Sequence, residues 1–380
     1  MGPLSGIRII EIASLGPGPF CGMMLADHGA EVIRIDRTTA IPSALERTDE
    51  EILNRSRKVI SVNLKSVEGV EIVRRLCRTA DGLIEGFRPG VMERLGLGPD
   101  ILLSDNPKLI YGRMTGWGQT GPYSHTAGHD INYIALSGAL EAIGRAGEKP
   151  VPPLNLVGDF GGGGMMLAFG MVAALLAART TGTGQVIDCA MTEGSALLMA
   201  MIYSYHAAGT WSGARGTNML DGGAHFYDSY ETADGKYIAI GSVEPQFYRT
   251  LLELLGLAGD AEFTHQLDPR RWPHLKGRLT RLFKSKSRAE WCTLLEGSDA
   301  CFTPILSMAE VPGHAHNAVR NAFIELAGVI QPAPAPRYSG TPTAAPSSLD
   351  RSMVVAEQLL TSVGYSNNEI RQLREAGSID

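Results

Sequence analysis

Two short segments of the sequence carry residues that can move protons. His129 stands in Ala-Gly-His-Asp-Ile-Asn-Tyr, and Asp159 stands in Asn-Leu-Val-Gly-Asp-Phe, just before four consecutive glycines. Each residue precedes an apolar run that is typical of a helix, and a helix start offers unpaired N–H groups and a positive dipole end. A histidine and an aspartate held in this way can flank one carbon and carry a proton across it. That chemistry is typical of a racemase or an epimerase.

A third candidate is Glu244, which lies between an expected strand and an expected helix. As a structural residue it would be a first-turn acid favoured by the helix dipole. As a functional residue its carboxylate would orient His129 and stabilise the protonated ring. His129 can itself be a core or capping histidine, but an unperturbed imidazole titrates near neutral pH and can act as acid or base.

Asp159 also has a structural interpretation, since aspartate is a common N-cap. The glycine run 161–164 argues against a simple cap. Each glycine in a helix costs about 0.8–1 kcal/mol relative to alanine. That cost suits a position where something approaches the backbone closely. The N–H groups of Gly161 and Gly162, at the expected helix start, are therefore candidate donors to an oxyanion.

Basic residues gather near the ends of the expected strands, where open α/β sheets bind ligands. They either form a solvated surface or hold an anionic ligand, and they are Arg37, Arg57, Lys58, Lys65, Arg88 and Arg94. The sequence Gly16-Pro17-Gly18-Pro19 after the first strand breaks the dinucleotide fingerprint, and there is no Walker loop. A dinucleotide or nucleoside triphosphate in a standard loop is therefore not expected.

The bulk composition is that of an ordinary globular protein. The 380 residues are 44% hydrophobic and 19% charged, which allows two domains, and the net charge of -6 gives no reason to expect nucleic acid as a partner. The five cysteines form no CxxC pair, as in a reduced, cytoplasmic protein. We expect no signal peptide and no membrane span, because the longest apolar run, 165–178, is too short to cross a bilayer and is better interpreted as a buried helix.

The pattern of elements changes along the chain. Strands at 7–12, 31–36, 58–62, 82–85 and 109–113 alternate with helices at 17–28 and 66–79, which predicts an α/β fold with a doubly wound parallel sheet. A helix from Asp159 to about 180, a possible strand at 185–188 and a helix at 192–208 follow. After them a hairpin turns at Asp234-Gly235, and helices at 245–255, 275–283 and 288–295 indicate a smaller α+β domain. Prolines between 332 and 346 exclude a helix there, and a last helix is expected at 366–376.

Several motifs together resemble the family III CoA-transferase superfamily. They are Gly16–Pro19, Arg34–Arg37, Arg88–Gly90, Arg94–Pro99, Thr115–Pro122 and the two segments around His129 and Asp159. Within that superfamily, His129, Asp159 and Glu-Pro-Gln-Phe-Tyr at 244–248 resemble the α-methylacyl-CoA racemases. The resemblance extends to about Pro336.

The resemblance implies an intertwined homodimer with a Rossmann-like large domain, built from both chain ends, and a smaller inserted α+β domain. The implied boundaries are 1–208 for the N-terminal part of the large domain, 209–223 for a linker, 224–315 for the small domain, and 316–380 for the return and the tail. The active site of the family lies between the large domain of one subunit and the small domain of the other. His129 and Asp159 would be its two acid/base residues, with Glu244 as the partner of His129.

The resemblance also implies which residues contact CoA, which is part of the substrate, so that no separate cofactor and no metal is expected. These residues are Arg37, Val62, Asn63, Leu64, Lys65, Gly86, Phe87, Arg88, Arg94, Gly128, Asp130, Ile131, Asn132 and Tyr133. At Val62 and Asn63 the contacts are expected to be partly through the backbone.

The implied reaction interconverts (2R)- and (2S)-2-methylacyl-CoA thioesters. Two alternatives stay open. In a CoA transferase on the same fold, Asp159 would attack the thioester and form a mixed anhydride, and His129 and Glu244 would not be needed. In a non-catalytic acyl-CoA-binding protein there would be no turnover to lose. The acyl chain itself is left open by the sequence.

Overall fold

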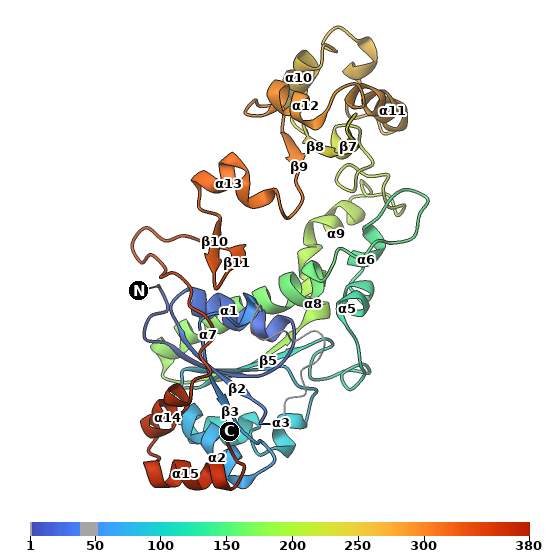
Figure 1. Cartoon of the computed structure of the whole chain (residues 1–380). Helices are drawn as coiled ribbons and strands as arrows, with labels where there is room; N and C mark the ends of the chain where they lie inside the picture. The colour runs from blue at the N-terminus through green and yellow to red at the C-terminus, as the bar shows by residue number, and fades with distance from the viewer. Residues whose placement is uncertain (1, 39–51) are drawn as a thin grey trace. The chain divides into compact units, whose positions relative to one another are not determined.

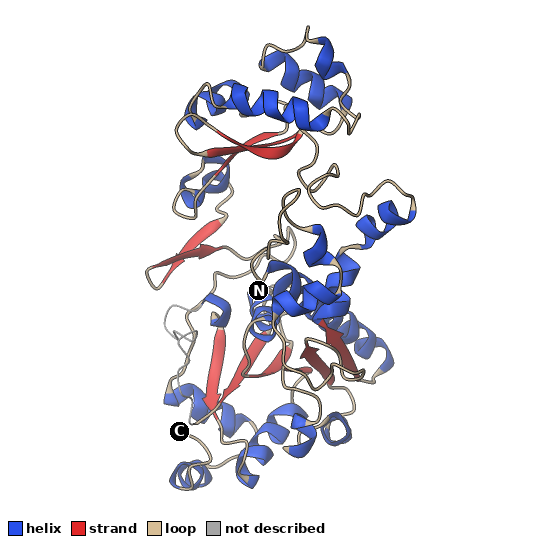
Figure 2. Cartoon of the chain, turned by 90° about the vertical axis from the view of Figure 1, so that its right-hand side faces the viewer, coloured by secondary structure: helices blue, strands red, loops and turns tan. Residues whose placement is uncertain are grey.

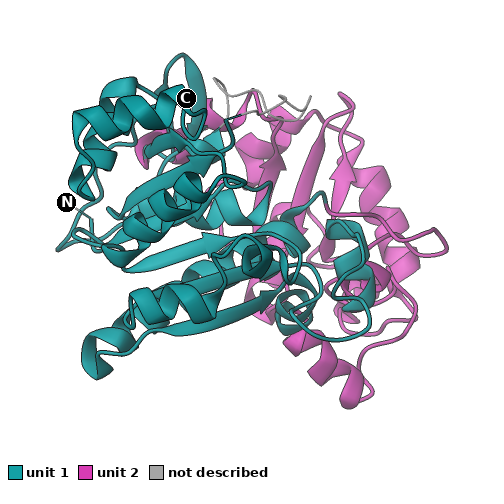
Figure 3. Cartoon of the chain, turned by 90° about the horizontal axis from the view of Figure 1, so that it is seen from below, with its two compact units in different colours: residues 1–137, 154–198, 321–380 teal, residues 138–153, 199–320 magenta. Residues whose placement is uncertain are grey.

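The computed structural model describes residues 2–38 and 52–380 (Figure 1). The chain divides into two compact units, which are coloured separately in Figure 3. Unit 1 consists of residues 1–137, 154–198 and 321–380, and unit 2 of residues 138–153 and 199–320. The expected boundary at 208 differs from this division, which assigns both 138–153 and 199–208 to unit 2.

Unit 1 is built on a sheet of six parallel strands. They are β1 (Arg8–Ile12), β2 (Glu31–Asp36), β3 (Arg57–Ser61), β4 (Gly82–Glu85), β5 (Ile110–Thr115) and β6 (Gln185–Ala190). The spatial order is β3-β2-β1-β4-β5-β6, so the direction of winding reverses beside β1. That reversal is the switch point at which open α/β sheets bind ligands. The prediction of a parallel, doubly wound sheet is confirmed.

Apolar residues cover both faces of this sheet, as expected for parallel strands. Ile9 and Ile10 are consecutive and fully buried, and they enter different cores because side chains alternate along a strand. The core around Ile9 is closed by α1 (Pro17–Asp27) and α7 (Met166–Thr181). The core around Ile10 is closed by α2 (Val67–Arg78), α4 (Pro99–Asp105), α14 (Met353–Ser362) and α15 (Asn367–Glu375). Figure 2 shows helices on both sides of the strands.

The other elements of unit 1 are shorter. They are the 3-10 turn Ile52–Asn54, α3 (Val91–Arg94), α5 (Asp130–Leu136), α8 (Met191–Leu198), and the antiparallel pair β10 (Phe323–Leu326) and β11 (Val329–Pro332). The expected helix at 192–208 is broken at Met199, and its second half is α9 (Ala200–Ala207) of unit 2. The expected cap of α2 is present, because the Ser66 hydroxyl accepts the Gly69 N–H at 3.0 Å. No helix forms between 333 and 349, in agreement with the prolines there.

The long apolar helix differs from two expectations, namely that it is too short to cross a bilayer and that it is buried. A π-helical segment, Leu156–Met165, runs directly into α7, so the continuous helix spans Leu156–Thr181. Its 26 residues make it, within the described residues, long and apolar enough to cross a membrane by length and composition alone. It is also not wholly buried, because Phe169 is 72% and Leu176 is 68% exposed. The opposite side packs in the core, where Leu167 and Met171 are fully buried.

Unit 2 has an antiparallel sheet made of β7 (Tyr227–Glu231), β8 (Tyr237–Gly241) and β9 (Phe302–Ile305). Its core packs between the sheet and α10 (Pro245–Leu254), α11 (Trp272–Phe283) and α12 (Arg288–Leu295). Gly235 has a φ of 71° in the hairpin turn, which confirms the turn predicted at Asp234-Gly235. The remaining elements of this unit are α6 (Ala139–Ala142), α13 (Ala315–Val319), and two 3-10 turns at Ala261–Thr264 and Val311–Gly313.

Candidate functional site

The carboxyl ends of the parallel strands bring several predicted ligand residues to one edge of unit 1. Arg37 follows β2 and Phe87 follows β4, the two strands that flank β1. The Arg37 guanidinium lies 6.0 Å from the centre of the Phe87 ring. Ser14 follows β1 and lies beside Gly86, where an added Cβ would come within 3.1 Å of it. These loops therefore form one surface at the switch point of the sheet.

The loop after β4 is anchored from below by a buried carboxylate. Glu85 is fully buried, accepts the Phe87 N–H at 2.7 Å and pairs with Arg113 at 3.1 Å. Burial raises the pKa of Glu85 to about 7, although the Phe87 N–H and Arg113 act in the opposite direction. Arg88 and Arg94 follow Glu85 in the chain and are exposed, so their charges can meet an anionic ligand.

The loop after β3 is held mainly by the C-terminal residues. Val62 is fully buried, its N–H donates to the Asp36 carbonyl, and it forms an isolated bridge with Ile379. The Asn63 N–H donates to the Ser378 carbonyl. Val62 therefore has a packing role, and its side chain does not reach a ligand. Leu64 packs against the core and Lys65 is exposed, so Lys65 is the residue of this loop that is best placed to meet an anion.

Asp159 lies in a partly buried environment inside the π-helical segment. Its Oδ2 accepts a hydrogen bond from the Asn155 amide at 3.2 Å. Gly16, with a φ of 67°, faces the same oxygen, and a Cβ there would come within 3.3 Å of it. Burial raises the pKa of the Asp159 carboxyl above its usual range, and the charge of Asp130 adds to this, while Asn155 and His129 oppose it. A raised pKa allows this carboxyl to act as an acid as well as a base.

His129 is close enough to Asp159 for their charges to interact. It occupies the N-cap position of α5, where its own N–H donates to the Asn132 Oδ1 at 3.0 Å and its side chain is exposed. The helix start expected at His129 is therefore confirmed. Within unit 1 the segments of His129 and Asp159 are in contact, because Asp130, which follows His129 in the chain, accepts the Asp159 N–H at 2.7 Å. The role of the two residues as a proton-transfer pair stays a prediction.

The helix start expected at Asp159 is wrong. The helix begins at Leu156, so Gly161 and Gly162 lie inside it rather than at its first residue. In a π-helix each N–H donates to the carbonyl five residues earlier. The N–H groups of Gly161 and Gly162 are consequently used within the helix, and the first-turn N–H groups of α5, beside His129, are the better candidate donors to an oxyanion.

The glycine run is explained by close packing of the protein on itself. A Cβ on Gly162 would lie 2.5 Å from the Ser195 nitrogen of α8, and one on Gly164 would lie 2.7 Å from the Pro17 carbonyl of α1. The π-helical segment is thus clamped between two helices. The sequence predicts that another group approaches the backbone of these glycines closely. In the structure that group is the backbone of α1 and α8, and no ligand is needed to explain the glycines.

Residues 128–133 contribute in different ways. Asp130 is buried and its Oδ1 accepts the Asp159 N–H at 2.7 Å, and its contact with CoA stays a prediction. The Tyr133 hydroxyl donates to the Gly128 carbonyl, and burial raises the pKa of Tyr133 to about 12. Ile131 and Asn132 are exposed.

Glu244 belongs to unit 2, where it is the N-cap residue of α10 by backbone conformation. Its side chain makes no capping hydrogen bond and is exposed, and its position at the start of α10 is compatible with an acid favoured by the helix dipole. Gln266 braces the loop before it by donating to the carbonyls of Ser242 and Val243. The charge of Glu244 acts on the nearby Cys301 thiol, whose pKa is raised mainly by burial. The pairing of Glu244 with His129 stays a prediction.

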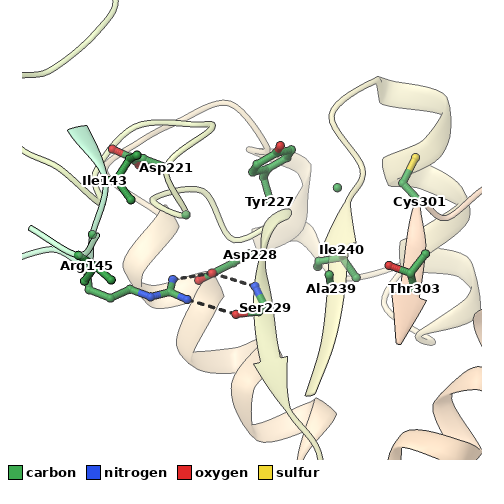
Figure 4. A pocket seen from close by; sticks show the side chains of 14 residues that line it. Ile143, Arg145, Asp221, Tyr227, Asp228, Ser229, Ala239, Ile240, Cys301 and Thr303 are labelled. Carbon is green, nitrogen blue, oxygen red and sulfur yellow. Dashed lines mark hydrogen bonds and ion pairs between the residues drawn. The ribbon is translucent and has the colours of Figure 1, made fainter. Parts of the chain in front are cut away.

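A pocket of about 630 Å³ opens over the sheet of unit 2 (Figure 4). Arg145 crosses one side of it and pairs with Asp228 at 2.6 Å. Tyr227, Ile240 and Cys301 contribute to its wall. None of the predicted site residues lines this pocket. Within residues 2–38 and 52–380, no group of three His, Cys, Asp or Glu side chains is arranged to hold a metal ion.

Two contacts of Asp159 were missed from the sequence. Asn155 lies one helical turn before Asp159, a spacing that could have indicated the hydrogen bond. Gly16 is distant in sequence, and nothing local signals that it leaves room for the Asp159 carboxylate.

Comparison with known proteins agrees with this geometry. The family model described as CoA-transferase family III matches residues 4–348. The α-methylacyl-CoA racemase of Mus musculus is 48% identical over 97% of this chain and 96% of its own. The succinyl-CoA:glutarate CoA-transferase of Mus musculus is 32% identical over 89% of this chain and 81% of its own. A CAIB/BAIF family protein from Brucella suis has a TM-score of 0.81 at 25% identity, covering 95% of this chain and 99% of that one. The chain therefore belongs to CoA-transferase family III.

Proposed function

We propose that this protein is an isomerase, an α-methylacyl-CoA racemase that interconverts (2R)- and (2S)-2-methylacyl-CoA thioesters. The observation that carries the proposal is the contact between the segments of His129 and Asp159, in which Asp130 accepts the Asp159 N–H at 2.7 Å, in a chain that is 48% identical to a racemase of that name. One group removes the α-hydrogen and the other returns a proton to the opposite face of the carbon. The pair therefore inverts the centre without a net change in bonds.

The thioester makes the α-hydrogen removable only if the enolate oxygen is stabilised. His129 deprotonates one enantiomer and Asp159 the other, and each reprotonates in the opposite direction. Asp159 has to hold a proton for half of these events, and its raised pKa supports that role. Glu244 would orient His129 and stabilise its protonated ring.

The CoA moiety would lie across the carboxyl edge of the sheet in unit 1. Arg37, Arg88 and Arg94 are exposed there and suit its phosphates, and the Phe87 ring offers a stacking surface. No resident cofactor is required by this mechanism, because CoA enters and leaves with the substrate.

A homodimer is part of the proposal. Apolar side chains are exposed along α7 and α8 of unit 1, with Phe169, Leu176, Leu197 and Leu198 each more than half exposed. An apolar surface of this kind marks a protein interface or a ligand groove. The smaller α+β region would be inserted into the large domain, and its Glu244 would complete the site of the other subunit. We propose that the protein works in the cytoplasm, which its five cysteines without a CxxC pair support, and that it takes part in fatty acid metabolism.

The second candidate is a CoA transferase. The 32% identity to the succinyl-CoA:glutarate CoA-transferase of Mus musculus supports this alternative. There the Asp159 carboxylate would attack the thioester carbonyl and displace CoA thiolate, which forms a mixed anhydride of the acyl group and Asp159. The thiolate would then attack the Asp159 carbonyl and release the first carboxylic acid. A second carboxylic acid would take CoA from this Asp159 thioester by the same two steps in reverse.

A single experiment separates the candidates. One pure enantiomer of a 2-methylacyl-CoA is incubated with the protein in deuterium oxide, with and without a free carboxylic acid. The racemase is expected to incorporate one deuterium at the α-carbon and to lose optical purity without the acid. Acyl exchange that depends on the acid would support the transferase, and neither change would indicate a protein that only binds acyl-CoA.

A further inference from the structure

Asp130 is a buried carboxylate between the two residues that would exchange the proton. It follows His129 directly in the chain, and the residue is only 7% exposed. Its Oδ1 accepts the backbone N–H of Asp159 at 2.7 Å. Its Oδ2 is buried and, among the described residues, has no hydrogen-bonding partner.

The surrounding backbone is shaped to admit this carboxylate. The Asp159 N–H lies in the first turn of the π-helical segment, where it has no carbonyl within the helix to bind. Gly158 leaves the necessary space, since a Cβ at that position would overlap the Asp130 Oδ1. A buried charge with one oxygen unpaired is costly, so a site that retains it needs a reason beyond stability.

We propose that Asp130 is a positioning residue, whose hydrogen bond to the Asp159 N–H fixes the spacing between His129 and Asp159. The geometry is direct, because residue 130 is bonded covalently to one member of the pair and through its side chain to the backbone of the other. Proton transfer is sensitive to such spacing, and a displacement of about 1 Å costs on the order of 100-fold in rate. The inference rests on the proposed 1,1-proton transfer.

The same carboxylate sets the electrostatic environment of Asp159. Asp130 favours the protonated form of Asp159, whereas His129 and the Asn155 amide favour the ionised form. Tyr133 is on the same helix as Asp130. Its pKa is raised by burial and also by the charge of Asp159, and the charge of Arg88 opposes this rise. The facing segments of α1 and α8 present glycine, proline, phenylalanine, serine and methionine, none of them charged. Burial is the main cause of the raised pKa of Asp159, and the charge of Asp130 adds to it.

Two variants separate position from charge. Asp130→Asn keeps an oxygen acceptor of nearly the same shape and removes the charge. Its maximal kcat should stay within about 3-fold of the wild type, with the acid limb for the enantiomer deprotonated by Asp159 moved to lower pH. Asp130→Ala removes the acceptor as well, and should lower kcat by roughly 10- to 100-fold with little change in KM.

The matched control is Asp105→Ala, which removes a carboxylate of the same unit that binds Arg74 and contacts neither His129 nor Asp159. It should leave the pH profile and kcat unchanged. All variants are compared by circular dichroism and thermal melting, and the Asn variant keeps the proposal testable if the Ala variant does not fold.

Deuterium incorporation by the wild type is measured first, because its absence would reject the racemase itself and not the role of Asp130. If the wild type exchanges and Asp130→Ala keeps the kcat of the wild type, the positioning role is overturned. An unshifted pH profile in Asp130→Asn would overturn its electrostatic effect on Asp159. The positioning role is equally overturned if either variant raises KM while kcat is preserved, since Asp130 would then act in CoA binding.

Discussion

At the scale of single residues, the two acid/base groups occupy unlike environments. His129 is exposed at the start of a short helix, whereas Asp159 is partly buried inside a π-helical segment. Burial raises the pKa of Asp159, so its carboxyl holds a proton more readily than an exposed one. A racemase requires this, because Asp159 has to act as an acid for one enantiomer and as a base for the other.

Single variants should therefore separate the two enantiomers. His129→Ala and Asp159→Asn are each expected to reduce racemisation by about 10²- to 10⁴-fold. Each variant should still exchange the α-hydrogen of the one enantiomer that faces the remaining base. Deuterium incorporation from each pure enantiomer, followed by mass spectrometry, measures this directly.

The control for His129→Ala is His125→Ala, which removes an exposed histidine of the same loop and should have no effect. Loss of activity only in Asp159→Asn, with His129→Ala fully active, would point to the nucleophile of a transferase instead.

His225 links the stability of unit 2 to pH. It is fully buried, and its Nε2 lies 2.8 Å from the Tyr248 hydroxyl. Because that hydroxyl donates to the Phe263 carbonyl at 3.1 Å, the His225 Nε2–H is the donor to it. The Nδ1 is buried without a partner among the described residues. Burial, and secondarily Lys276, lowers the pKa of His225 to about 4.

Acid should therefore weaken this unit. The folded-state pKa of His225 lies below that of the unfolded chain, near 6.5, so its contribution is complete above pH 6.5 and is lost as the pH falls towards 4. The loss is at most on the order of 3 kcal/mol. Urea unfolding between pH 7 and 4 should show this slope, and His225→Gln should flatten it. An equal slope in the variant would assign the acid sensitivity to other groups.

At the scale of elements, the π-helical segment positions Asp159 because it is held tightly between α1 and α8. The aromatic rings of Phe20 and Phe160 pack with centroids 4.8 Å apart on the α1 side. The fully buried Arg57 donates to the Pro19 carbonyl of α1 and pairs with Glu11 at 3.1 Å. A fixed α1 in turn fixes Gly16 beside the Asp159 carboxylate.

Two glycines of one continuous helix should change the stability of the protein in opposite ways when each is replaced by alanine. Gly162→Ala places a Cβ 2.5 Å from the backbone of α8 and should destabilise the protein by about 1–3 kcal/mol. Gly170→Ala meets only the Ile187 side chain at 3.5 Å, and should be neutral or stabilising by up to about 1 kcal/mol. Thermal melting of the two variants tests the comparison, and similar melting temperatures would refute the clamp.

The sequence predicted the elements whose signals are local. The strands of the parallel sheet, the cap at Ser66 and the turn at Asp234-Gly235 follow from hydrophobic runs and residues of known preference. The short strands β9, β10 and β11 and helix α14 were not anticipated. Strand β9 pairs with β8, which is distant in the sequence, whereas β10 and β11 pair with each other across residues 327 and 328. The break at Met199 was missed because the helical pattern continues across it.

In the functional site, too, some features have a local signal in the sequence and others depend on contacts between distant segments. The residue types at His129 and Asp159 indicated proton transfer, and in the structure the segments of the two residues are in contact. The start of the helix at Leu156 and the roles of Gly16 and Asp130 depend on contacts between segments, and no local pattern encodes them.

At the scale of the whole molecule, the proposed site draws on both units. His129 and Asp159 belong to unit 1, and Glu244 belongs to unit 2. If the dimer shares its sites as proposed, Glu244 of each subunit serves the His129 of the other. Subunits damaged at different residues should then complement one another.

Mixed dimers test that arrangement. His129→Ala and Glu244→Gln subunits are each expected to be nearly inactive alone. After unfolding and refolding together in equal amounts, half of the dimers should be mixed, and each mixed dimer should hold one site with both native residues. Activity should therefore recover to about one quarter of the wild-type value, as symmetry requires. A mixture of His129→Ala with Asp159→Asn is the control and should recover nothing, because both residues come from the same unit of one chain. No recovery in either mixture would place Glu244 in the site of its own subunit.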